Sequence, residues 1–214
     1  MKKKLLVLST LVGALGLAAC SSEPAAAPLE AQPLYKLLVN ASESGLVDAS
    51  ERNDTSLDSE PINLTVVNGA QDIEGKCGEA LQAVEGTEIP TIASASRVIS
   101  SGEKQVGIAM YSTPEDSDIS PMKLYEDIAK ACTEPVKDAD NTTYQFETSD
   151  AVPEGAVGFT LSIDVSPDNR GSSIMMIQHI GNHHLIVAGL GASEEETATV
   201  FEAQRTKLEQ GTAV

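Results

Sequence analysis

The sequence predicts an α+β fold, a single domain with one twisted antiparallel sheet, helices mainly on one face and one disulfide. Three observations lead to this prediction. Several β-rich segments follow one another at hairpin spacing, which requires antiparallel pairing because a parallel neighbour needs a longer crossover. Amphipathic helical segments lie before, between and after these strands. Apart from Cys20, at the end of a leader-like segment, the chain contains two cysteines.

The first predicted elements are short. Apolar residues recur at helical spacing over residues 34–41, which predicts a helix. Residues 50–61 carry four acidic side chains among Ser, Thr and Asn, which predicts an exposed loop. Residues 62–67 are β-branched and apolar and predict a short strand. A second short helix is expected around Cys77, with apolar residues on one face.

A hairpin and a helix are expected in the middle of the chain. The β-rich runs 91–100 and 104–111 flank Ser101-Gly102, a pair typical of a turn. Ser120-Pro121 then combines an N-cap residue with a proline suited to the first helical turn. The apolar stripe of this helix includes Cys132 and directs its thiol towards the core.

The last third of the chain predicts three strands and a helix. Residues 156–165 alternate strictly between apolar and polar or small side chains, which indicates a strand with one buried face. Residues 173–180 and 183–190 flank Gly181-Asn182, a signal for a two-residue hairpin. Ser193 and Glu196 have the spacing of a capping box, so a closing helix is expected to begin there.

Both faces of the 173–190 hairpin are apolar. One face is expected to carry Met175, Ile177, Ile186 and Ala188, and the other Ile174, Met176, Ile180, Leu185 and Val187. One interpretation is a central strand pair covered by helices on both sides. The other is a cleft, in which methionines adapt to an apolar or amphiphilic ligand.

The N-terminal residues predict export. Lys2, Lys3 and Lys4 precede an apolar run that ends in Leu17-Ala18-Ala19-Cys20, which resembles the lipobox of bacterial lipoproteins. That resemblance implies cleavage before Cys20 and a lipid on its sulfur, with acyl chains that anchor the protein to a membrane. An ordinary secretory signal is the alternative.

Three segments are therefore expected. Residues 1–19 are predicted to be a lipoprotein signal peptide. Residues 20–33, rich in Ser, Ala, Pro and Glu, are predicted to be a flexible linker. Residues 34–210 are predicted to form the domain, held at the extracytoplasmic face of the cell membrane.

The charge of the chain excludes nucleic-acid binding. The formal net charge is −18, and without residues 1–19 it becomes −21, from 11 basic and 32 acidic residues. Phosphate backbones are bound by clustered Lys and Arg, which this sequence lacks. The acidity is typical of a protein kept dispersed by self-repulsion.

The cysteines at positions 77 and 132 are expected to form a disulfide, because they are an even pair in an exported protein. Closing a loop of about 56 residues would stabilise the fold by about 4 kcal/mol in the chain-entropy model. Reactive thiols or a metal site are the alternatives. The former are usually closely spaced, and the latter would need further ligands nearby.

The pattern as a whole resembles the PknH-type extracellular sensor domain and related actinobacterial envelope lipoproteins. The resemblance covers residues 34–210. It depends on the order of Leu37-Leu38, Cys77-Gly78-Glu79-Ala80-Leu81, Ala131-Cys132, Ile180-Gly181-Asn182-His183 and Ile186-Val187-Ala188. It implies a twisted antiparallel sheet with a cleft for an unknown ligand. This chain has cysteines for one bridge where that family has two, and it has no tryptophan.

Candidate site chemistry is limited to two histidines. If Gly181 and Asn182 form the turn, His179 lies directly opposite His184, close enough for two imidazoles to share a metal. Half-exposed strand histidines are the favoured interpretation, so no metal or cofactor is expected. The chain has no Gly-x-Ser-x-Gly motif, and no catalytic residues are predicted.

These observations predict a membrane-anchored, non-catalytic lipoprotein with a sensor-like domain that binds an unknown small or amphiphilic ligand. The alternative is an envelope scaffolding lipoprotein that acts through a protein partner. A concave pocket would favour a ligand, whereas a large exposed apolar patch would favour a partner. The sequence identifies no ligand-binding residues.

Overall fold

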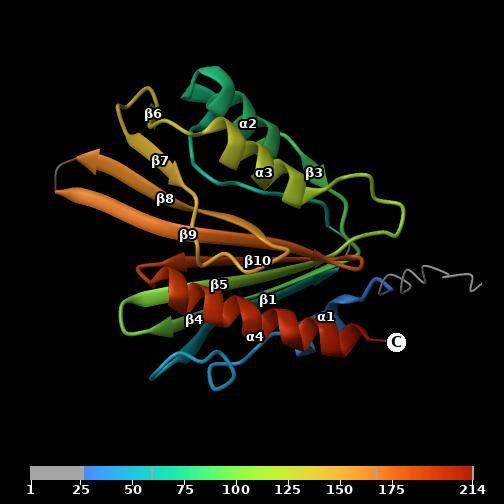
Figure 1. Cartoon of the computed structure of the whole chain (residues 1–214). Helices are drawn as coiled ribbons and strands as arrows, with labels where there is room; N and C mark the ends of the chain where they lie inside the picture. The colour runs from blue at the N-terminus through green and yellow to red at the C-terminus, as the bar shows by residue number, and fades with distance from the viewer. Residues whose placement is uncertain (1–26, 59, 167, 214) are drawn as a thin grey trace, which may run out of the picture.

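An eight-stranded antiparallel sheet forms the middle layer of the domain (Figure 1). The computed structural model describes residues 27–58, 60–166 and 168–213. In order across the sheet the strands are β1 (Ser50–Asp58), β4 (Ala93–Ser101), β5 (Lys104–Ser112), β10 (His183–Leu190), β9 (Asn169–Ile180), β8 (Val157–Ser166), β7 (Thr143–Glu147) and β6 (Val136–Lys137). A separate two-stranded ladder joins β2 (Ile62–Asn63) to β3 (Glu88–Ile89). The predicted α+β class and antiparallel sheet are confirmed.

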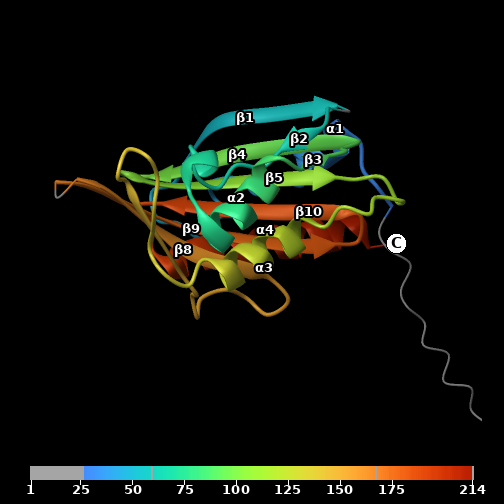
Figure 2. The same cartoon turned by 90° about the horizontal axis from the view of Figure 1, so that it is seen from above.

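Helices cover both faces of this sheet, so the prediction that they lie mainly on one face is wrong. Helices α1 (Ala31–Lys36) and α4 (Glu194–Thr212) pack on one face. Helices α2 (Gly75–Glu85) and α3 (Pro121–Ala131) pack on the other, together with the short 3-10 turn η1 (Ala70–Asp72). Figure 1 shows the sheet between the two helix layers, and Figure 2 shows α2 and α3 across it from above.

The physical reason is that the sheet carries two cores. The core under α1 and α4 uses β4, β5, β9 and β10, whereas the core under α2 and α3 extends from β5 to β7. The two cores overlap at β5, β10 and β9, which is why the 173–190 hairpin is apolar on both faces. Its interpretation as a covered central strand pair is confirmed, with the predicted residues on each face.

The predicted turns and caps are confirmed with small shifts. Gly181 has a φ of 61°, the left-handed conformation that favours glycine at the first turn position, and β9 pairs with β10 from Ile180 and His183 outwards. The turn between β4 and β5 is Gly102-Glu103, one residue later than predicted. The Ser120 side chain accepts a hydrogen bond from the Lys123 amide, and Ser193 forms the predicted capping box.

The acidic segment 50–61 is a strand for most of its length, so the predicted loop is wrong. It forms β1, an edge strand paired only with β4 among the described residues. Polar and charged side chains suit an edge strand because one of its sides faces water. Arg97 is 7% exposed, and its guanidinium donates to both Asp54 carboxylate oxygens at 2.7 and 3.0 Å and to the Val39 carbonyl oxygen. This network holds β1 and the chain after α1 against β4.

The N- and C-terminal helices are joined to each other by hydrogen bonds. The buried Gln204 side chain of α4 accepts from the Val39 amide and donates to the Leu37 carbonyl, both at 2.8 Å. Ala31 is buried and is the first residue of α1, three residues before the position at which the sequence predicts the domain to start. Among the described residues, no helix is long and apolar enough to cross a membrane.

Candidate functional site

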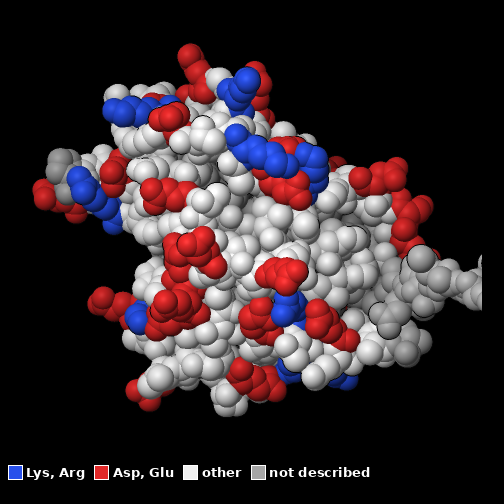
Figure 3. Space-filling view, in the orientation of Figure 1, with Lys and Arg blue, Asp and Glu red and all other residues white. Residues whose placement is uncertain are grey.

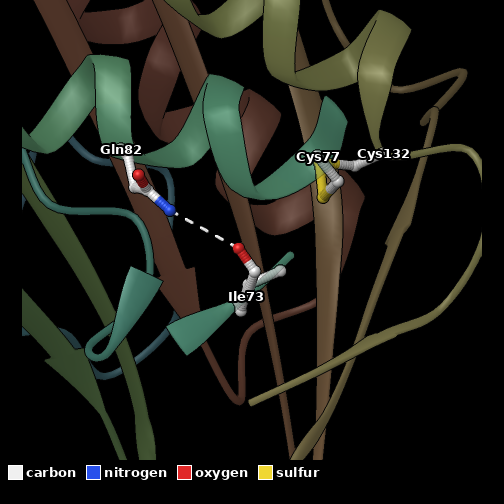
Figure 4. The surroundings of a disulfide bond; sticks show 4 residues. All are labelled: Ile73, Cys77, Gln82 and Cys132. Carbon is white, nitrogen blue, oxygen red and sulfur yellow. Dashed lines mark hydrogen bonds between the residues drawn. A yellow bond between two sulfur atoms is a disulfide. The ribbon is translucent and has the colours of Figure 1, made fainter. Parts of the chain in front are cut away.

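The predicted disulfide joins the two helices that lie above one end of the sheet. The sulfur atoms of Cys77 in α2 and Cys132 after α3 are bonded at 2.00 Å, with the Cα atoms 4.6 Å apart (Figure 4). The first turn of α2 packs tightly on the preceding chain, since a Cβ on Gly78 would lie 1.8 Å from the Ile73 carbonyl oxygen. Gln82 donates to that same oxygen at 3.4 Å (Figure 4). A side chain at position 78 would therefore displace α2.

A cavity of about 450 Å³ lies beside the disulfide, between the C-terminal end of α3 and strands β7 and β8. The residues that line it are Ala129, Cys132, Thr133, Phe146, Glu147, Thr148 and Phe159. Its lining combines aromatic, small apolar and hydroxyl groups. Such a mixture is typical of a pocket that takes the apolar part of a ligand and orients it with a few polar contacts.

The base of the cavity is an aromatic cluster. The Phe159 ring stacks on Tyr125 with 5.7 Å between ring centroids, and it meets Phe146 edge-on at 5.4 Å. Tyr125 and Phe159 are each 1% exposed, so the cluster is rigidly held in the core below α3. Burial raises the pKa of the Tyr125 phenol, which therefore stays protonated at any physiological pH. Of the three rings, those of Phe146 and Phe159 border the cavity, so this part of its lining is apolar and uncharged.

The sequence prediction missed this cavity. It placed a possible cleft at Met175 and Met176, but Met176 is completely buried and Met175 packs against the core under α2 and α3. The alternation of Tyr144 and Phe146 with polar neighbours was the signal available for β7. That signal covers five residues, and it does not reveal the helix end that completes the cavity.

The predicted histidine pair is present at the β9–β10 turn. His179 and His184 are direct cross-strand neighbours, and their rings stack with 4.6 Å between centroids and 15° between planes. His183 lies on the opposite face of β10, where its Nδ1 is 3.3 Å from the Ile180 carbonyl oxygen. His183 and His184 are buried, whereas His179 is exposed.

Burial dominates the electrostatics of this pair. Burial, together with smaller charge repulsion from His179 and His183, lowers the pKa of His184 to about 4. Burial also lowers the pKa values of His179 and His183. His184 Nδ1 and His183 Nε2 are buried without a hydrogen-bond partner in the structure. The rings are therefore neutral at pH 7, and neither buried nitrogen is oriented by a carboxylate as in a catalytic triad.

These histidines do not make a complete metal site. The cross-strand pair brings two imidazoles together, as the sequence predicts. Across residues 27–213, as far as the structure describes them, no group of three His, Cys, Asp or Glu side chains could hold a metal ion. Protein zinc sites use three or four ligands, so His179 and His184 lack the rest of a coordination sphere.

The predicted lipidation residue, Cys20, and the signal segment 1–19 lie outside the described residues, as does most of the linker 20–33. The structure therefore does not place the anchor. The described chain enters the domain at α1, at the opposite end from β6 and β7 in Figure 1. The cavity beside β7 is consequently at the end of the domain far from this entry.

Comparison with known proteins finds similar solved structures but no sequence match. No family model and no curated protein matches this chain. The extracellular domain of PknH from Mycobacterium tuberculosis is 12% identical with a TM-score of 0.48, over 86% of this chain and 99% of that one. An uncharacterised protein of Mycobacterium smegmatis, the Rv0999 ortholog, is 13% identical with a TM-score of 0.45, over 76% of this chain and 88% of that one. At these TM-scores the similarities carry no functional argument.

Proposed function

We propose that this protein is a bacterial lipoprotein anchored at the extracytoplasmic face of the cell membrane, and that its domain binds a small or amphiphilic ligand without catalysing a reaction. The observation that carries the ligand-binding proposal is the cavity between α3 and β7. Its volume of about 450 Å³ is within the range usual for small-molecule sites, about 300–1,000 Å³.

The aromatic base of this cavity supports binding of an apolar group. Phe146 and Phe159 border the cavity and are held by ring–ring contacts in the core, with 7% and 1% of each residue exposed. Preorganised apolar surface lowers the entropic cost of binding. Thr133 and Thr148 at the rim can orient a polar end of the ligand through their hydroxyls. An amphiphilic molecule could contact both the aromatic residues and the threonine hydroxyls.

The anchoring proposal is supported by the lipobox-like Leu17-Ala18-Ala19-Cys20 and by the disulfide, because disulfides persist mainly in exported proteins. With an anchor at Cys20, the entry of the chain at α1 would leave the cavity on the side of the domain away from the tether. This orientation would keep the cavity accessible from the envelope.

Binding can be tested with the neutral apolar fluorophore N-phenyl-1-naphthylamine and a fragment of residues 27–214, which contains both cores and the disulfide. We expect saturable fluorescence enhancement that Ala129→Leu reduces at least fivefold, because the larger side chain fills the cavity. Ala139→Leu, at an exposed position outside this cavity, should bind as the wild type does. Equal binding by both variants would contradict the proposed site.

Anchoring can be tested separately in a bacterial host supplied with radiolabelled palmitate. The full-length chain should incorporate label and fractionate with membranes, whereas Cys20→Ala should lose both properties. An unlabelled wild-type chain would contradict the lipoprotein assignment and leave the binding result unaffected.

A further inference from the structure

The cavity lies against an open segment of sheet edge. Strand β6 pairs only with Thr143 and Tyr144 of β7. In the part of the chain that the structure describes, Phe146 and Glu147 therefore have a strand partner on the β8 side alone. Pro135 comes directly before β6 and has no amide hydrogen to donate, which is consistent with the pairing ending there. Backbone donors and acceptors at an open edge are a template for another strand.

The orientation of β7 brings its main chain to the cavity. Phe146 points towards α3, into the core with Phe159. Gln145 and Glu147 point to the opposite face, where the Gln145 side-chain amide donates to Glu147 Oε1 at 2.8 Å. Glu147 nevertheless borders the cavity. Since its side chain faces away, we take its main chain as the part that forms the wall.

We propose that this slot binds an extended peptide segment, which adds as a short strand opposite Phe146, Glu147 and Thr148. This inference rests on the proposed ligand-binding function and specifies its ligand class. Added strands of this kind obtain affinity from main-chain hydrogen bonds and specificity from alternate side chains. The peptide residues opposite Phe146 and Thr148 would project into the cavity beside the aromatic cluster and should be apolar.

Charge complementarity indicates which type of peptide residue would lie opposite Glu147, between the two apolar ones. A peptide side chain opposite Glu147 projects to the same face as its carboxylate. Thr160 is the neighbour of Glu147 on β8, and its hydroxyl donates to Glu194 Oε1 at 2.5 Å, which brings a second carboxylate to this face. Hydrogen bonds from Ser149 and Thr160 lower the pKa of Glu194, so it is ionised at pH 7. A Lys or Arg is therefore favoured, and the recognised pattern is apolar–basic–apolar.

The peptide Ac-Ala-Val-Lys-Val-Ala-NH₂ tests this pattern on the 27–214 fragment. We expect amide chemical-shift changes in NMR spectra centred on Phe146, Glu147 and Thr148, and displacement of N-phenyl-1-naphthylamine. Replacing the peptide lysine with glutamate should weaken binding. Glu147→Gln should weaken binding of the lysine peptide by about two- to fivefold at low salt, the range of an exposed ion pair. Gln105→Glu, at an exposed position of β5, is the control expected to change nothing.

N-methylated peptides test the strand pairing itself. In an added strand successive amides point alternately towards and away from the sheet edge. Methylation of one alternate set should abolish binding, whereas methylation of the other set should leave it within twofold. Equal effects of both sets would overturn the inference. The inference would also be overturned if the fluorophore binds but the peptide neither displaces it nor shifts the amide signals of β7. That outcome would leave the proposed ligand-binding function intact. Failure of both the fluorophore and the peptide to bind would overturn both proposals.

Discussion

At the scale of single residues, the domain depends on a few buried polar side chains. His184 is 2% exposed and Gln204 is completely buried, but the two side chains differ in their hydrogen bonding. Gln204 has hydrogen-bond partners for both its oxygen and its nitrogen, whereas His184 Nδ1 has none. A satisfied buried amide supports the fold, but an unsatisfied imidazole makes it sensitive to acid.

We predict that His184 makes the domain less stable below pH 6.5. Its pKa in the fold is about 4, below the ordinary value of 6.5. The neutral form is favoured, so this contribution to stability is complete above pH 6.5 and is lost as the pH falls towards 4. When the pH is lowered from 7 to 5, the unfolding free energy of the wild type should fall by about 2 kcal/mol more than that of His184→Phe.

Urea unfolding at a series of pH values would measure this difference. His179→Phe is the matched comparison on the neighbouring strand, and it should have the smaller effect because His179 is exposed. Parallel pH profiles for the wild type and His184→Phe would show that this histidine is protonated equally in the folded and unfolded states.

For Gln204 we predict a loss of stability at any pH near neutral. Gln204→Leu keeps an apolar stem of similar size but leaves the Val39 amide and the Leu37 carbonyl without their partner. The unfolding free energy should fall by about 1–3 kcal/mol, measured by urea denaturation. Gln210→Leu, exposed on the same helix, should change it by less than about 0.5 kcal/mol. Similar losses in both variants would indicate a general effect of leucine on α4.

At the scale of elements, the two helix layers are attached in different ways. Helix α4 is long, begins with a complete capping box and packs on β5, β9 and β10. Helices α2 and α3 each have 11 residues, and the disulfide joins them. Short helices depend on tertiary contacts, so α2 and α3 should be the elements most sensitive to loss of a constraint.

We predict that removing the disulfide destabilises the domain by about 4 kcal/mol, because the sequence separation of 55 residues is a large loop to close. Cys77→Ala with Cys132→Ala should show this loss in urea unfolding, and reductant added to the wild type should reproduce it. Hydrogen exchange should increase in α2 and α3 more than in α4. A uniform increase across all four helices would contradict the separate attachment of the two layers.

At the scale of the whole molecule, acidity is the dominant property. Figure 3 shows acidic side chains spread over one face, with fewer basic ones among them. The fragment 27–214 has 11 basic and 31 acidic residues, a formal charge of −20. Its ion pairs include Lys104 with Glu196 and Lys207 with Glu43, but most acids have no basic residue available. Self-repulsion should therefore oppose folding.

We predict that salt stabilises the fragment. Raising sodium chloride from 20 to 300 mM should increase Tm by about 2–4 °C, which corresponds to roughly 1 kcal/mol for a domain of this size. Choline chloride at equal ionic strength should give the same increase if screening is the cause. A lower Tm at high salt would show that the ion pairs outweigh the repulsion.

The elements with local signals could be predicted from the amino-acid sequence alone. Ser120 and Ser193 cap helices through bonds to their own first turns, and Gly181 adopts the conformation that its turn requires. The 156–165 alternation and the pairing of His179 with His184 follow in the same way from period and turn position. Each of these features depends on residues within a few positions of one another, so the local sequence is enough to predict it.

Three features depend instead on long-range packing: the strand conformation of β1, the distribution of helices over both faces and the position of the cavity. The polar sequence of β1 is compatible with a loop until its neighbour β4 supplies hydrogen bonds and Arg97. The cavity exists because Cys132, Phe146 and Phe159 meet where β6 ends. These residues are far apart along the chain, and their meeting depends on packing that no local pattern encodes.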